Sequence, residues 1–183
     1  MKKHLVLAIC IALLPGLVSA SGSSAPTPEN RASDALGVSV GWITGKGMMY
    51  RRYMGDNYFQ AGMIAYYNKD QGDKYGDLAL MVGRYIHYTN FSEQFFPVAL
   101  KVLMGAEVEI GAEYEDPLTY LQEKSDYFHI GAGIGMDIGN PAQRGFALSL
   151  DLTYIASFRD LQLNEKGLVF VEPRPGVSFF YNF

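Results

Sequence analysis

The fold of this chain is decided by its final stretch, Pro175-Gly-Val-Ser-Phe-Phe-Tyr-Asn-Phe183. Every second position in it carries an apolar or aromatic side chain: Val177, Phe179, Tyr181 and Phe183. Because successive side chains of a strand point to opposite faces, these four residues form one continuous apolar face. A strand that ends on an aromatic ring, with aromatic rings before it on the same face, is typical of the closing strand of a barrel whose outside meets lipid.

The same stretch carries a family resemblance. Arg174, Gly176, Phe179, Tyr181 and the last residue, Phe183, form a pattern that resembles the assembly signal of bacterial outer-membrane β-barrels. The resemblance implies export, recognition by the barrel-assembly machinery and a transmembrane barrel among the outer-membrane lipids of a Gram-negative bacterium. It implies nothing about activity.

The beginning of the chain reads as an export signal. Lys2 and Lys3 precede an apolar run over residues 5–14, and Val-Ser-Ala at 18–20 supplies the small residues that precede a cleavage site. We therefore expect three segments: a signal peptide over 1–20, a flexible leader over 21–34 that is rich in Ser, Pro and Ala, and a barrel domain over 35–183.

Composition narrows the class further. The only cysteine, Cys10, lies in the predicted signal, so no disulfide can staple the remaining chain. The formal net charge of −4 argues against a nucleic-acid partner, which clustered Lys and Arg would indicate. Beyond the signal there is no apolar run of about 18 residues, so a membrane would have to be crossed by strands.

From residue 36 onward, segments with period-2 alternation are separated by turn residues, and none has a helical stripe. This pattern predicts an all-β fold, an eight-stranded antiparallel transmembrane β-barrel with up-and-down meander order. The predicted strands cover residues 36–43, 48–54, 58–67, 75–88, 96–114, 126–139, 144–158 and 176–183. The connections after the second, fourth and sixth strands are predicted to be short, and those after the third, fifth and seventh longer, as in outer-membrane barrels. The first hairpin, at 44–47, is as tight as the short turns.

Two strands indicate which face is wet. Over 96–114 the apolar side chains share one face, while Lys101, Glu107 and Glu109 fall on the other. Over 126–139 the face opposite the apolar residues alternates glycine with His129 and Asp137. A glycine-rich face suits the crowded interior of a narrow barrel. We therefore expect apolar side chains to point outward to lipid and charged ones inward.

The fourth strand fits this rule less well. Leu78, Leu80 and Val82 share parity with Arg84, so a regular strand would aim that arginine at lipid. A β-bulge near Gly83 would return Arg84 to the interior, and the alternative is a position near the membrane interface.

The interior is therefore predicted to hold a network of charged and polar side chains. An eight-stranded barrel has an interior just wide enough for side chains to fill, and buried charges need partners. We expect the network to plug the lumen, with one of Arg51 and Arg52 also pointing inward. Its predicted members are Arg84, Lys101, Glu107, Glu109, His129, Asp137 and Asp151.

A second resemblance concerns the class of barrel. The glycine-rich first hairpin with Met49-Tyr-Arg-Arg-Tyr53, the Gly131-Ala-Gly-Ile-Gly135 strand and the aromatic ending are similar to the small bacterial outer-membrane β-barrel domain family, the OmpA- and OmpX-like barrels. The resemblance covers residues 35–183. It implies architecture, with members that are structural barrels or adhesins.

Catalytic and metal-binding motifs are weak. His87-Tyr-Thr89 loosely resembles the His-x-Ser of outer-membrane lipid A deacylases but has Thr for Ser, and the histidines lack metal-ligand spacing. We predict a non-enzymatic protein without cofactor, with a structural or surface-interaction role and a ligand surface in the loops 115–125 and 159–172. The alternatives are an OmpW-like conduit for small apolar solutes and a lipid-modifying enzyme.

Overall fold

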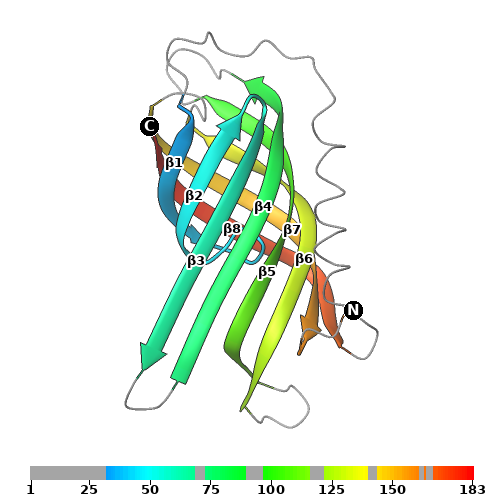
Figure 1. Ribbon diagram of the computed structural model, residues 1–183. Coiled ribbons are helices and arrows are strands. Elements are labelled where there is room, and N and C mark those ends of the chain that lie inside the picture. Colours follow the sequence, from blue (N-terminus) through cyan, green and yellow to red (C-terminus); the bar gives the residue numbers. More distant parts are fainter. Residues whose placement is uncertain are drawn as a thin grey trace.

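The computed structural model describes residues 32–68, 73–89, 97–115, 122–139, 144–160, 163 and 167–183. They form one closed barrel of eight strands (Figure 1). The strands are β1 Asp34–Val40, β2 Gly47–Met54, β3 Asn57–Asn68, β4 Asp73–Thr89, β5 Val98–Glu115, β6 Gln122–Ile138, β7 Gly145–Arg159 and β8 Leu168–Asn182. Among the described residues, no helix is long and apolar enough to cross a membrane.

Each strand pairs antiparallel with its neighbours in sequence, and β1 closes the barrel by pairing with β8 from Ala35↔Asn182 to Val40↔Val177. The predicted all-β, eight-stranded meander barrel is therefore confirmed. The C-terminal alternation that suggested a closing strand does form the seam with β1. We call the end of the barrel that carries Phe183 the terminal end, at the top of Figure 1, and the opposite end the far end.

The two faces of the wall have opposite chemistry. Leu100, Ile134 and Leu150 lie on the outside with 38%, 62% and 36% of their surface exposed, whereas Glu107 and Asp151 are buried inside. Glycine supplies the room that the interior needs. A Cβ on Gly135 would overlap the Asp151 carboxylate and lie 2.7 Å from Lys101 Cε, so this position has to remain without a side chain.

Strand lengths differ from the prediction at the seam. β1 ends at Val40 rather than at residue 43, and β8 begins at Leu168 rather than at 176. β8 thus includes Pro173 and Pro175, although proline cannot donate a hydrogen bond to a neighbouring strand. Before Val177, however, β8 pairs with β7 alone, and a strand edge without a second partner tolerates proline.

The far-end loops are smaller than predicted. β5 runs to Glu115 and β6 starts at Gln122, so the predicted loop 115–125 shrinks to residues 116–121, which lie outside the described residues. The predicted loop 159–172 loses its end, residues 168–172, to β8. The expected alternation of short and long connections is wrong, since residues 69–72 join β3 to β4 while 90–97 join β4 to β5. The turn-forming residues that suggested longer loops lie within the strands instead, because the strands continue through them.

The predicted bulge near Gly83 is also wrong. Register between β4 and β5 is continuous through Gly83↔Leu103 and Arg84↔Val102, and it shifts only between Tyr85 and His87. A Cβ on Gly83 would overlap the ring of Tyr58 inside the barrel, so Gly83 faces inward and Arg84 outward. Arg84 therefore lies on the outer face near the terminal end of β4 and does not join the interior network.

The predicted signal peptide and most of the predicted leader, residues 1–31, lie outside the described residues. The end of the leader is attached to the barrel rim. Ser33 N–H donates to Phe183 O at 3.3 Å, Tyr53 N–H donates to Ser33 O at 2.8 Å, and Asp34 is the first residue of β1.

Candidate functional site

The connection between β1 and β2 folds into the barrel instead of crossing its rim. Residues 41–46 turn partway along the barrel, well short of the far ends of β3 and β4 (Figure 1). Ile43 and Thr44 are buried, and Ile43 packs in the same core cluster as Tyr58. Gly45, at φ 88°, lies back to back with Gly62 of β3, where a Cβ on Gly45 would come within 2.8 Å of Gly62 Cα. We call residues 41–46 the in-folded segment.

Next to this segment, Arg51 of β2 occupies the centre of the barrel. Its Nε and Nη2 donate to Gln60 Oε1 at 2.9 and 2.7 Å, and Nη1 donates to Asp137 Oδ2 at 2.6 Å. The guanidinium lies between the rings of Tyr58 and Phe180, 4.5 and 4.3 Å from their centroids. Such stacking suits a planar cation that is weakly hydrated.

Lys101 of β5 completes the charge pairing. Its ammonium lies 2.7 Å from Asp137 Oδ1 and 2.8 Å from Asp151 Oδ1, and it also donates to Ser149 Oγ. Asp137 thus bridges two cations, and it accepts a further hydrogen bond from Tyr85 Oη at 2.5 Å. Two cations and two carboxylates balance each other, so each of these four buried charges has a partner of opposite sign.

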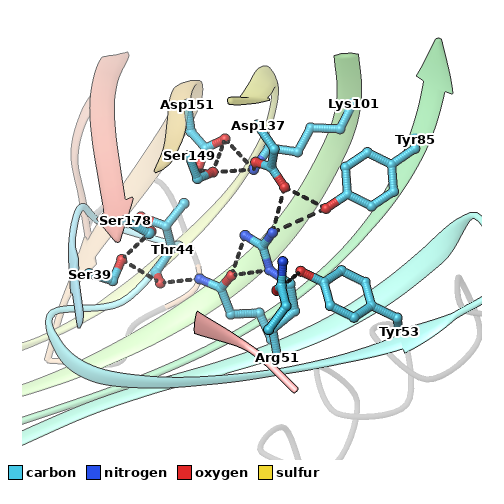
Figure 2. A network of polar contacts seen from close by, with 12 residues as sticks. Ser39, Thr44, Arg51, Tyr53, Tyr85, Lys101, Asp137, Ser149, Asp151 and Ser178 are labelled. Carbon is cyan, nitrogen blue, oxygen red and sulfur yellow. Dashed lines mark hydrogen bonds and ion pairs between the residues drawn. The ribbon is translucent and has the colours of Figure 1, made fainter. Parts of the chain in front are cut away.

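The seam between β1 and β8 belongs to the same constellation. Ser39 Oγ lies 2.8 Å from Ser178 Oγ and donates to Thr44 O at 3.1 Å, and Gln60 Nε2 donates to that carbonyl at 2.8 Å. Figure 2 shows these side chains converging across the lumen. Every strand contributes to this group, which we call the central network: Ser39, Arg51, Gln60, Tyr85, Lys101, Asp137, Ser149, Asp151 and Ser178.

A second group lies toward the far end around Lys46, the last residue of the in-folded segment. Its ammonium lies 2.6 Å from Glu109, 3.4 Å from Glu107 and 3.6 Å from Asp77. Tyr75 Oη donates to the same Glu109 oxygen at 2.7 Å. We call these residues, with His129 and Ser157, the far-end cluster.

Charge is unbalanced in the far-end cluster, because three carboxylates surround the single ammonium of Lys46. Glu107 has none of its surface exposed, yet neither of its oxygens makes a hydrogen bond among the described residues. Within the same residues, no group of His, Cys, Asp and Glu side chains is suited to hold a metal ion. The ammonium of Lys46 occupies the centre of this acidic group.

His129 links two residues of the far-end cluster. Its Nδ1 lies 2.6 Å from Ser157 Oγ and its Nε2 lies 3.1 Å from Glu109 Oε2. The order serine, histidine, carboxylate is that of a nucleophile with its base and orienting acid. Ser157 has none of its surface exposed, however, and the ring of Trp42 packs edge-on against His129 at 4.6 Å between centroids. In this arrangement the chain of hydrogen bonds satisfies buried polar groups.

The structure brings most of the predicted interior residues together, but into two groups. Lys101, Asp137 and Asp151 belong to the central network, whereas Glu107, Glu109 and His129 belong to the far-end cluster. Arg51 points inward and Arg52 is exposed. Sequence reasoning missed Gln60, Tyr85 and Lys46. The parity of Gln60 with the inward Tyr58 could have identified the glutamine, but no local signal places Lys46 inside a barrel.

The residues of the predicted assembly signal divide between the two faces. Phe179, Tyr181 and Phe183 point outward and are exposed, whereas Gly176 is buried beside Thr44. Arg174 lies over the ring of Trp42 at 4.7 Å. His87, the weak catalytic candidate, is exposed on the outer face opposite Leu100.

Comparisons of the chain with protein-family models, with curated proteins and with solved structures found no match.

Proposed function

We propose that this protein is an integral outer-membrane β-barrel with a structural or surface-interaction role, whose lumen is sealed by the central network. The observation that carries the proposal is the inverted distribution of side chains. Large apolar residues such as Ile134 and Leu152 cover the outside, while Arg51, Lys101 and Asp137 are fully buried. In water this arrangement would leave the apolar surface wet, whereas in a bilayer both faces are satisfied.

The spacing of aromatic residues on the outer face agrees with the thickness of an outer membrane. Phe146 near the terminal end stacks on Phe179 and contacts Tyr181, and Tyr154 is exposed further along β7. For a strand tilted by about 40°, the stretch from Phe146 to Tyr154 rises about 20 Å, close to the ~25 Å apolar band of outer-membrane barrels.

Membrane insertion is tested by gel mobility on outer-membrane fractions, with and without boiling. We expect the unheated protein to enrich in that fraction and to migrate as a compact species that boiling converts to the full-length position. Leu150→Arg should weaken the folded form by about 2–4 kcal/mol, the cost of an arginine at the bilayer midplane. The matched control is Arg52→Leu, an exposed charge near the rim. Unchanged mobility together with absence from the fraction would contradict the proposal.

Sealing of the lumen separates this role from that of a conduit. A chain of hydrogen bonds and ion pairs that draws on all eight strands leaves each central charge paired, in a barrel whose interior is just wide enough for side chains. We expect the purified protein to show no stable conductance in planar bilayers. Steady ion currents, or uptake of small apolar solutes that depends on the protein, would favour the conduit.

The enzymatic alternative now centres on His129 and Ser157 rather than on His87. We propose that both are structural. Overexpression should leave the acyl-chain profile of lipid A unchanged, and Ser157→Ala should alter stability but not that profile. A changed profile that Ser157→Ala abolishes would establish a lipid-modifying enzyme instead.

A further inference from the structure

The acidic surplus of the far-end cluster centres on Glu107. This side chain has none of its surface exposed, and neither of its carboxyl oxygens accepts a hydrogen bond from the described residues. The ammonium of Lys46 lies 3.4 Å from Oε1 without donating to it. An ionised carboxylate in this position would lack the hydrogen bonds that normally compensate the burial of a charge.

Glu109, on the same face of β5, is a carboxylate with donors in the same cluster. Its Oε1 accepts hydrogen bonds from Lys46 Nζ at 2.6 Å and from Tyr75 Oη at 2.7 Å. Its Oε2 lies 3.1 Å from His129 Nε2. Donors that point at a carboxylate favour its ionised form. Glu109 is therefore the member of the cluster suited to carry a negative charge, and Glu107 is the member suited to be neutral.

Asp77 of β4 supplies a partner for a neutral Glu107. In the register of β4 with β5, Asp77 stands opposite Glu109 and Ala79 stands opposite Glu107. Asp77 and Glu107 are thus diagonal neighbours on the inner face, and their carboxyl groups lie within hydrogen-bonding reach of each other. Asp77 is also buried, and its Oδ2 has no donor among the described residues.

One proton satisfies both of these carboxyl groups. Two carboxylates have no hydrogen to share, whereas a protonated carboxyl group has an O–H that can donate to the other. Asp77 already accepts a long hydrogen bond from the backbone N–H of Lys46, at 3.5 Å, while Glu107 accepts none from the described residues. The proton therefore belongs on Glu107, with Asp77 as its acceptor.

The surroundings of the pair supply one balancing cation and access to water. The titratable groups that face it are Tyr75 of β4, Glu109 of β5, His129 of β6 and Lys46 of the in-folded segment. Arg174 of β8 lies instead over the ring of Trp42. Lys46 has 27% of its side-chain surface exposed, so solvent reaches the cluster and can exchange a proton with it.

We propose that the far-end cluster is a proton-binding site, in which Glu107 is a neutral carboxylic acid at neutral pH and donates its hydrogen to Asp77. The proton lowers the cost of burying three carboxyl groups around one ammonium, because only Asp77 and Glu109 then remain charged beside Lys46. At alkaline pH the proton is released and the cluster holds three carboxylates. The site belongs to the folded barrel in a detergent micelle as much as in a bilayer, so the inference goes beyond the proposed function and does not depend on it.

Infrared spectroscopy tests the site directly, because the C=O stretch of a protonated carboxyl group is separate from the bands of a carboxylate. The full chain is folded in micelles of a detergent without carbonyl groups, and the unheated gel band verifies folding. We expect wild-type protein at neutral pH to show a protonated-carboxyl band that Glu107→Gln abolishes. Glu172→Gln is the matched control and should leave the band unchanged, because 39% of the Glu172 side-chain surface is exposed.

Asp77→Asn tests the acceptor. An asparagine amide can donate to an ionised Glu107, so this variant should lose the band at a lower pH than wild-type protein does. Absence of the band from folded wild-type protein at neutral pH would show that Glu107 is ionised and would overturn the inference. A band that persists in Glu107→Gln, or one that Asp77→Asn leaves unaltered, would place the proton on other groups, with the same consequence.

The pH dependence of stability is an independent readout. A glutamate of the unfolded chain loses its proton near about pH 4.3, so at neutral pH the folded barrel binds one proton more than the unfolded chain. The contribution of this site to the free energy of unfolding therefore falls as pH rises, from about pH 4.3 until the folded site also ionises. Between about pH 6 and 8, the folding equilibrium constant of wild-type protein should fall about tenfold more per pH unit than that of Glu107→Gln. Parallel pH dependence in the two proteins would contradict a bound proton.

Discussion

The two halves of the barrel interior differ in how their buried charges are paired. In the central network, Arg51 and Lys101 face Asp137 and Asp151, and each charge has partners at hydrogen-bond distance. In the far-end cluster, Lys46 stands alone among three carboxylates. The first half is enclosed by all eight strands, whereas the second has lost β1 and β2 from its wall.

This difference shows what a complete wall provides. Where every strand contributes at least one inward side chain, the partners of each charge come from the wall itself. Where the wall is incomplete, the partner comes from the in-folded segment, which brings Lys46 and Trp42 into the lumen. The central network therefore holds the barrel closed, and the far-end cluster holds the in-folded segment in place.

The largest expected effect is a loss of stability on removing a carboxylate from the central network, whereas the same kind of change in the far-end cluster should cause no loss. Asp137→Asn leaves Arg51 and Lys101 without their shared counter-charge and should lower the free energy of unfolding by about 3–5 kcal/mol. Glu107→Gln, the matched change in the far-end cluster, removes a carboxylate from an acidic surplus and should be neutral or stabilising. Urea titrations in vesicles, followed by the unheated gel band, measure both. Equal losses in the two variants would refute the contrast between the groups.

The second prediction concerns the space that holds the central pairs. Gly135→Ala should cost about 1–3 kcal/mol, because its methyl group would collide with Asp151 and crowd Lys101. Gly76→Ala on β4 is the control, since a Cβ there has no neighbour within 4 Å. The same titration compares them, and a harmless Gly135→Ala would mean that the Lys101–Asp151 pair can move without loss.

Third, Lys46→Met should cost about 1–2 kcal/mol by removing the charge-assisted hydrogen bond to Glu109. Part of that loss should return in Lys46→Met/Glu107→Gln, because fewer carboxylates then repel one another. A double-mutant cycle over these variants measures the coupling. If the changes in the free energy of unfolding, measured at a pH where Glu107 is ionised, were additive, Lys46 and Glu107 would not be coupled, and the prediction would be wrong.

The smallest effect is expected at the seam. Ser39→Ala should lower the free energy of unfolding by about 1 kcal/mol, because it removes the link between Ser178 and Thr44 O. Ser33→Ala, at the exposed rim, is the control. The temperature at which half of the folded gel band is converted is measured for both variants. An unchanged midpoint in Ser39→Ala would show that the seam between β1 and β8 does not contribute to the stability of the central network.

Sequence reasoning was reliable where a property repeats along one strand. The alternation around Leu100 and Lys101 gave the outward and inward faces, because side-chain direction in a strand is local. It failed for Arg84, where a bulge was inferred from charge alone and the register is continuous. It also failed for the start of β8, because the tolerance of Pro173 depends on the absence of a second neighbouring strand.

The sequence by itself determined the all-β fold, the meander order and the orientation of its two faces, since these follow from period 2 and from the closing segment that ends at Phe183. Only the tertiary structure decided where β1 stops, that residues 41–46 fill the lumen, and which charges meet. Those features depend on contacts between residues far apart in the chain, and no local pattern encodes which distant side chain will supply the partner of a buried charge.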